Sequence, residues 1–239
     1  MIPFKDDNPT ERYPIVTVGL IVLNVLVYLY QLSLGGSGQQ FFFRQMGAIP
    51  YEISHMADLP PYNVIPVPFT ILSAMFVHGG LMHLGGNMLY LWIFGDNVED
   101  SMGRVRFLLF YLICGVAASG LHIAIDPDST VPMVGASGAI AGVLGAYLLL
   151  YPQARVYTLL FLFFFIQVVR LPAVYVLGFW FFLQILYGLP SLGGVSSGGV
   201  AWFAHIGGFV AGVILIKGFA RARPAMWWRT MPPFALRIE

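Results

Sequence analysis

A serine set among small residues is the first position in this sequence that could do chemistry. Ser137 lies in the run MVGASGAIAG, next to Gly135 and Gly138, and it carries the only hydroxyl of that run. Small residues are common where two membrane helices approach closely, so helix packing alone would account for the run. A serine acts as a nucleophile only beside a general base, donors for an oxyanion and water.

His205 is the candidate for the base. It lies in GVAWFAHIGGFVAG, where Gly208 and Gly212 follow at helical spacing and share its face. Such a glycine ridge suits close helix contact, and the helix that begins at Ser137 has the same character. If these two surfaces pack together, His205 comes within hydrogen-bonding reach of the serine and can take its proton.

The stretch HGGLMHLGGNMLYLW supplies a third group of polar side chains. His83 and Asn87 are four residues apart and share a helix face, whereas His78 lies five residues earlier, in a loop or an irregular first turn. Asn87, His83 and the unpaired N–H groups at the start of the Ser137 helix can stabilise the oxyanion of acyl transfer. Since no acidic residue completes a triad, we expect a dyad of Ser137 and His205.

The same histidines do not have the spacing of a metal site. His78 and His83 are five residues apart, whereas a helix aims two imidazoles at one ion at a spacing of three or four. The single cysteine, Cys114, lies in an apolar stretch and is expected to pack between helices. The spacing therefore disfavours a metal site.

The composition of the chain indicates a membrane protein. Hydrophobic residues make up 58% of the 239 positions and charged residues 10%, with a mean hydropathy of +0.79. The net charge of +1 argues against a nucleic-acid partner. We expect an all-α polytopic protein in a lipid bilayer, and nothing in the sequence specifies an oligomeric state.

Apolar segments and basic residues together predict six transmembrane helices. Seven apolar segments occur, near 14–34, 80–97, 105–125, 135–151, 156–169, 171–189 and 200–220. If 156–169 does not cross the membrane, every Lys and Arg except Arg44 falls on one side, as the positive-inside rule requires. Both termini are then cytoplasmic, and 156–169 is a hairpin, a re-entrant loop or an interfacial helix.

This topology places the polar residues at one depth. His83, Ser137 and His205 each lie a few residues past a helix start, within roughly 10 Å of the outer boundary. Three polar side chains at matching depth indicate one cavity that is open to external water. The segment 35–79 becomes a long external loop that is partly embedded in the membrane interface.

We predict one domain with two short flanking segments. Residues 1–13 form a cytoplasmic N-terminal segment, 14–221 the catalytic domain and 222–239 a cytoplasmic tail. The absence of a transit segment favours a prokaryotic cell membrane. Glu99 and Asp100 are expected to cap a helix or to pair with nearby arginines.

Together these motifs resemble the rhomboid family of intramembrane serine proteases over roughly residues 10 to 220. The resemblance is carried by His78, His83 and Asn87, by the continuation NMLYLWIFGDNVEDSMG, by Gly135-Ala136-Ser137-Gly138, and by Ala204-His205 with Gly208 and Gly212. It implies cleavage of a peptide bond in or next to a transmembrane segment of another protein, without metal or cofactor. It also implies that Ser137 is the nucleophile, His205 the base, Asn87 and His83 the oxyanion side chains, and His78 a support for the external loop.

The sequence departs from the family pattern at the catalytic histidine. Some members carry a tyrosine four residues after the nucleophile, stacked on that histidine, whereas this chain has Ala141. Something else must therefore orient His205. Two other hypotheses are a catalytically silent rhomboid-like chaperone or binding protein, and a transporter. Ser137 and His205 are both present, which disfavours the first, and the spans show no repeated architecture, which disfavours the second.

Overall fold

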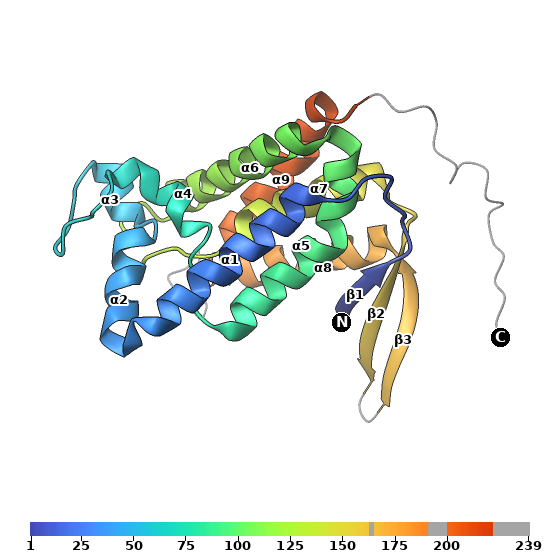
Figure 1. Ribbon diagram of the computed structural model, residues 1–239, viewed down its shortest axis with the longest axis horizontal. Coiled ribbons are helices and arrows are strands. Elements are labelled where there is room, and N and C mark those ends of the chain that lie inside the picture. The colour runs from blue at the N-terminus through green and yellow to red at the C-terminus, as the bar shows by residue number, and fades with distance from the viewer. Residues whose placement is uncertain (163–164, 191–199, 222–239) are drawn as a thin grey trace.

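The computed structural model of the protein describes residues 1–162, 165–190 and 200–221, so the predicted tail 222–239 lies outside the described residues. The helices are α1 (Ile15–Ser33), α2 (Gly35–Met46), α3 (Pro50–His55), α4 (Thr70–Ala74), α5 (Leu81–Met102), α6 (Arg104–Ile125), α7 (Ser137–Leu150), α8 (Ala173–Gly188) and α9 (Trp202–Phe219). The strands are β1 (Ile2–Asp6), β2 (Arg155–Leu162) and β3 (Phe165–Pro172). Figure 1 shows the long helices gathered into one bundle.

Three of the described helices, α1, α6 and α9, are long and apolar enough to cross a membrane. The apolar helices α7 and α8 have 14 and 16 residues, fewer than the roughly 20 that a bilayer needs. Helix α5 has 22 residues and carries Asp96, Glu99 and Asp100 towards its end. The protein is therefore a mostly helical integral membrane protein.

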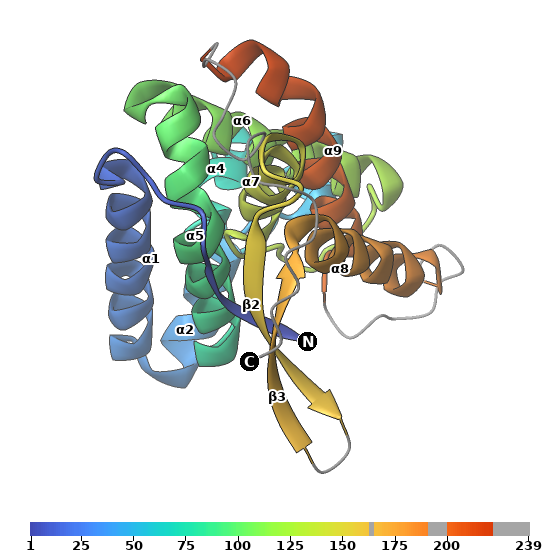
Figure 2. The same ribbon diagram turned by 90° about the vertical axis from the view of Figure 1, so that its right-hand side faces the viewer.

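Helix α7 lies at the centre of the bundle. It packs against α5, α6, α8 and α9, and Figure 2 shows it between α5 and α9, with α1 on the far side of α5. Every residue from Ala139 to Tyr147 is buried. Since much of this helix is glycine and alanine, its neighbours can approach closely.

The start of α1, the end of α5 and the end of α9 meet at one end of the bundle. Glu99 on α5 accepts hydrogen bonds from the backbone N–H groups of Val16 (3.1 Å) and Thr17 (2.8 Å). Its carboxylate thus satisfies donors at the N-terminus of α1 that have no partner within that helix. The chain after α9 reaches the same end, where the Arg221 N–H bonds the Ser101 oxygen (3.0 Å). Glu99 therefore caps a helix as expected, and that helix is α1.

The structure corrects the expectation of an all-α protein at one place. An antiparallel sheet has the strand order β1-β2-β3, and β2 pairs with β3 from Arg155↔Pro172 onwards. The segment 156–169 thus forms a β-hairpin, because its aromatic and β-branched residues favour strands. Strand β1 joins the N-terminal segment 1–13 to this hairpin. Figure 1 shows the hairpin extending away from the helices, and Figure 2 shows that it connects α7 to α8.

Asp6 attaches this sheet to the bundle. Its carboxylate accepts a short hydrogen bond from the Tyr147 hydroxyl on α7. Burial raises the pKa of Asp6 to about 6; the hydrogen bond from Tyr147 opposes this shift, and neighbouring Asp7 adds to it. Because the folded pKa lies above the ordinary value of 3.8, folding favours the protonated form. Stability is therefore lost as the pH rises from about 4 through 6.

We expect Asp6→Asn to stabilise the docked β1 by about 1 to 2 kcal/mol at pH 8, allowing for partial solvent screening, and to change little at pH 4. The asparagine keeps an oxygen for the Tyr147 hydroxyl and removes the charge that burial disfavours. Hydrogen exchange of the β1 amides in detergent, corrected for intrinsic rates, measures the change. Glu11→Gln is the control because Glu11 is exposed on the same segment. If Asp6→Asn changed the protection of the β1 amides, relative to the wild type, by the same amount at both pH values, the expectation would be contradicted.

Candidate active site

Ser137 is the first residue of α7, immediately after a turn that only glycine adopts easily. Gly135 has φ +122, and its N–H donates to the Ala74 oxygen at 2.8 Å. The first turn of a helix leaves backbone N–H groups without intrahelical partners, at the positive end of the helix dipole. Ser137 is partly exposed, whereas Ala136 beside it is buried. Ser137 thus lies beside a set of backbone hydrogen-bond donors.

His205 lies in the first turn of α9 and faces this serine. Its Nε2 atom is 2.8 Å from Ser137 Oγ, a normal hydrogen-bond distance. A hydroxyl bonded to an imidazole nitrogen is the arrangement of a nucleophile with its general base.

Glycines hold α7 and α9 at the spacing that this contact needs. A Cβ atom on Gly208 would collide with the Gly138 backbone oxygen, and one on Gly212 with the backbone of Gly142. The two helices therefore meet backbone to backbone along this ridge. His205 lies one turn before Gly208, so the same packing sets its distance from the start of α7.

The side chains of His83 and Asn87 reach the turn that precedes Ser137. A Cβ atom on Gly135 would stand 2.7 Å from His83 Nε2 and 3.6 Å from Asn87 Nδ2. Asn87 is 8% exposed. The structure thus brings one nitrogen of each side chain to the same glycine, two residues from the serine.

His78 is fully buried in the segment before α5 and supports these side chains. Its backbone oxygen accepts a hydrogen bond from Gln31 Nε2 on α1 (2.7 Å), and its Nε2 accepts one from Asn87 Nδ2 (3.0 Å). Burial, helped by neighbouring His83, lowers the pKa of His78 to about 4. The ring is therefore neutral at pH 7 and able to accept a hydrogen bond.

Residues that sequence reasoning missed surround the other side of His205. Gln184 Oε1 on α8 lies 2.8 Å from its Nδ1. The rings of Trp180 and Trp202 have centroids 5.9 Å and 6.1 Å from the imidazole. Gln184 could have been singled out, because it is the only polar side chain without a ring in AVYVLGFWFFLQILYG, and polar residues in lipid normally have partners.

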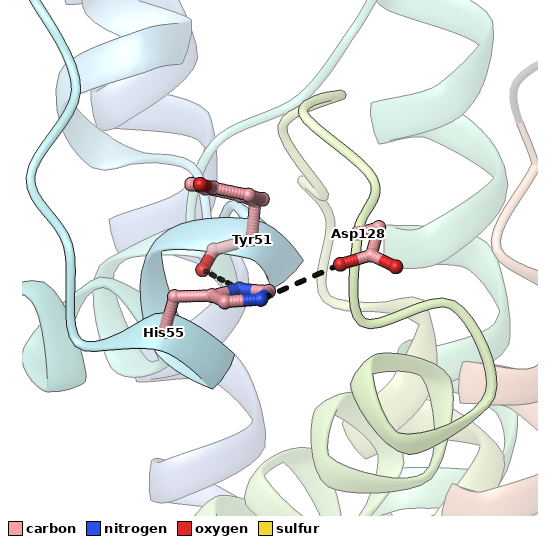
Figure 3. A network of polar contacts seen from close by, with 3 residues as sticks. All are labelled: Tyr51, His55 and Asp128. Atoms are coloured by element: carbon pink, nitrogen blue, oxygen red, sulfur yellow. Dashed lines mark hydrogen bonds and ion pairs between the residues drawn. The ribbon is translucent and has the colours of Figure 1, made fainter.

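His55 lies apart from this site. Figure 3 shows it on α3, stacked on Tyr51, with Nδ1 3.1 Å from the Tyr51 oxygen and Nε2 3.5 Å from Asp128 Oδ1. This contact joins α3 to the loop before α7, a structural role. His122 on α6, by contrast, interacts electrostatically with His205. Within the described residues, no three His, Cys, Asp or Glu side chains are grouped to hold a metal.

Comparison with known proteins points to the same family as the sequence motifs. Relatives include "Rhomboid protease GluP" of Bacillus subtilis, 34% identical over 145 residues (61% of this chain and 25% of that protein). "RHOMBOID-like protein 4" of Arabidopsis thaliana is 35% identical over 160 residues (66% and 35%), and "Rhomboid protease AarA" of Providencia stuartii 29% over 146 (55% and 49%). The aligned part of the chain spans a quarter to a half of the length of these relatives. Residues 67–222, more than half of the chain, match the family model described as the Rhomboid domain, so the protein belongs to the rhomboid family.

Proposed function

We propose that this protein is an intramembrane serine endopeptidase that cleaves peptide bonds in or next to transmembrane segments of membrane-protein substrates. The observation that carries the proposal is the 2.8 Å hydrogen bond between Ser137 Oγ and His205 Nε2. Membership of the rhomboid family supports it, as do relatives whose names include rhomboid proteases.

Ser137 and His205 would divide the reaction between them. His205 takes the hydroxyl proton as Ser137 Oγ attacks the scissile carbonyl, and it then gives that proton to the leaving amine. The acyl group remains on Ser137 as an ester. His205 next takes a proton from water, which attacks the ester, and returns the proton to Ser137 Oγ as the acid leaves.

Three donors would stabilise the oxyanion of each step. The first is the Ser137 backbone N–H, at the start of α7. The second is Asn87 Nδ2, which has two hydrogens and gives only one of them to His78. The third is His83 Nε2: since Gly79 N–H donates to His83 Nδ1 (3.4 Å), the ring hydrogen belongs on Nε2, beside Gly135.

We further propose six spans, formed by α1, α5, α6, α7, α8 and α9, with both termini in the cytoplasm. The positions of the basic residues support this topology, because Arg106 and Arg155 both lie at the end of the bundle where α1 begins. There Arg106 Nη1 donates to the Phe219 oxygen (3.4 Å), and the Asp7 N–H donates to the Arg155 oxygen (3.0 Å). Ser137 and His205 lie in the first turns of α7 and α9, at the opposite end. The bacterial relatives support a prokaryotic cell membrane.

Fluorophosphonate labelling of the detergent-solubilised protein, read by mass spectrometry, tests the proposed nucleophile. We expect the label on Ser137 in the wild type, and none on that residue in Ser137→Ala or His205→Ala. Ser119→Ala is the control, because it removes a buried hydroxyl from α6 and should leave labelling unchanged. A folded wild type without label at Ser137 would overturn the proposal in favour of a catalytically silent binding protein.

A further inference from the structure

We propose that Gln184 is the positioning residue of His205, and that it holds the imidazole in the tautomer able to accept the Ser137 proton. The inference rests on the proposed function, since it concerns the same dyad. It also answers the question raised by Ala141, which leaves His205 without an aromatic ring from α7. Gln184 reaches the site from α8, and it belongs to none of the motifs that carry the family resemblance.

The orientation of the Gln184 amide follows from its two hydrogen bonds. Its Nε2 lies 2.9 Å from the Trp180 backbone oxygen, and its Oε1 lies 2.8 Å from His205 Nδ1. A carbonyl oxygen only accepts hydrogen bonds, so the amide NH₂ must face Trp180. The amide oxygen must then face His205. Exchanging the two ends would set oxygen against oxygen, so one orientation satisfies both contacts.

The orientation of the amide fixes the hydrogen on the imidazole. Because Gln184 Oε1 only accepts, His205 Nδ1 has to donate and therefore carries the ring hydrogen. In the neutral ring Nε2 is then bare, and its lone pair faces Ser137 Oγ. This is the tautomer that a general base needs. With the hydrogen on Nε2 instead, the ring could only donate to the serine and could not take its proton.

Gln184 makes its contact with His205 from a buried position. Gln184 is 5% exposed and is bonded through both ends of its amide, so its side chain has little freedom. Trp180 lies one turn before it on α8, and Trp202 stands edge-on to the imidazole from α9. These two rings limit the tilt of His205, while the amide sets its rotation and its proton.

A neutral amide also suits a base that must stay uncharged at rest. A carboxylate at this position would favour the imidazolium form and would itself be costly to bury. The titratable groups near His205 are His83 on α5 and His122 on α6, which interact with it electrostatically. Both are the same in every variant below, so a difference in pH profile between variants reports the change at position 184.

The test is the kinetics of cleavage of a transmembrane peptide in liposomes. We expect Gln184→Leu to lower kcat about 10- to 100-fold with KM within about twofold, less than the ten-thousandfold loss typical when a charged partner of the histidine is replaced. Gln184→Glu restores an acceptor for Nδ1. We expect it to recover most of kcat and to move the acidic limb of the kcat/KM profile up by about one pH unit, because a carboxylate favours imidazolium.

Phe182→Leu is the matched control. Phe182 is two residues away on α8 and is more than half exposed, so its change should leave kcat, KM and the pH profile as in the wild type. If Gln184→Leu does not fold, Gln184→Met keeps an unbranched chain of similar length and takes its place. A Gln184 variant that folds, lacks the acceptor and retains both kcat and the pH profile would overturn the proposal.

A second readout separates this inference from the proposed function. Spectra of protein with ¹⁵N-labelled histidine, assigned with His205→Ala, report which ring nitrogen carries the hydrogen and need no activity. We expect the hydrogen on Nδ1 in the wild type and a mixture of tautomers in Gln184→Leu. A wild type with the hydrogen on Nε2 would overturn the positioning role. A wild type with the hydrogen on Nδ1 but no label at Ser137 would instead count against the protease alone.

Discussion

Replacing Ser137 and His205 together is expected to cost no more activity than replacing either one. Ser137→Ala removes the nucleophile, and His205→Ala leaves a hydroxyl that nothing deprotonates. Each change should lower kcat/KM by at least about a thousandfold. Because the two side chains act through one hydrogen bond of 2.8 Å, the second substitution has nothing left to remove. Cleavage rates of one peptide by the four proteins of this double-mutant cycle give the measurement.

His55→Ala is the matched control for this cycle. It removes a histidine that pairs with Asp128 outside the site, and kcat/KM should stay within about twofold of the wild type because surface ion pairs contribute little. Losses that multiply, so that the double variant is slower than both single variants by the product of their effects, would contradict a dyad. In that case each residue would act on its own.

The approach of Ser137 to His205 could be predicted because small residues constrain helices in a simple way. Glycines at helical spacing on two apolar segments have few other uses in lipid than close contact. Close contact between the two helices then brings together the residues in their first turns, Ser137 and His205. Gly208 against Gly138 and Gly212 against Gly142 are the contacts that such a pattern implies.

Gln184 could not be placed in the same way. The sequence shows one polar side chain in an apolar helix, which indicates that it has a partner but not which one. The answer depends on how α8 rotates against α9, and large side chains such as Trp180 and Phe209 set that rotation through their packing. A pattern of residue types does not encode packing of this kind.

The small sheet was beyond sequence reasoning for a different reason. Strand β1 pairs with β2 across about 150 residues, from Ile2↔Leu159 to Asp6↔Val156. Nothing local in IPFKD specifies a partner so distant, and short strands depend on their neighbours more than on their own propensity. The apolar run 156–169 allowed several structures, and the pairing of β2 with β3 decides between them.

Two glycines of α9 give a sharper test of what holds the dyad together. We expect Gly212→Ala to destabilise the protein by about 3 kcal/mol or more, since added volume in a packed core forces backbone shifts. We expect Gly218→Ala, the same change six residues later, to be neutral or slightly stabilising, since alanine favours a helix by about 1 kcal/mol. Thermal unfolding in detergent and the rate of fluorophosphonate labelling measure the two effects.

The difference between these variants comes from what the new Cβ atom meets. At Gly212 it meets the backbone of Gly142, which cannot rotate away as a side chain would, whereas at Gly218 nothing lies within 4 Å. The clash must move α9 away from α7, and His205 moves with it. Labelling of Ser137 should therefore fall even where Gly212→Ala remains folded. A folded Gly212→Ala with wild-type labelling would mean that the glycine ridge does not set the distance between Ser137 and His205.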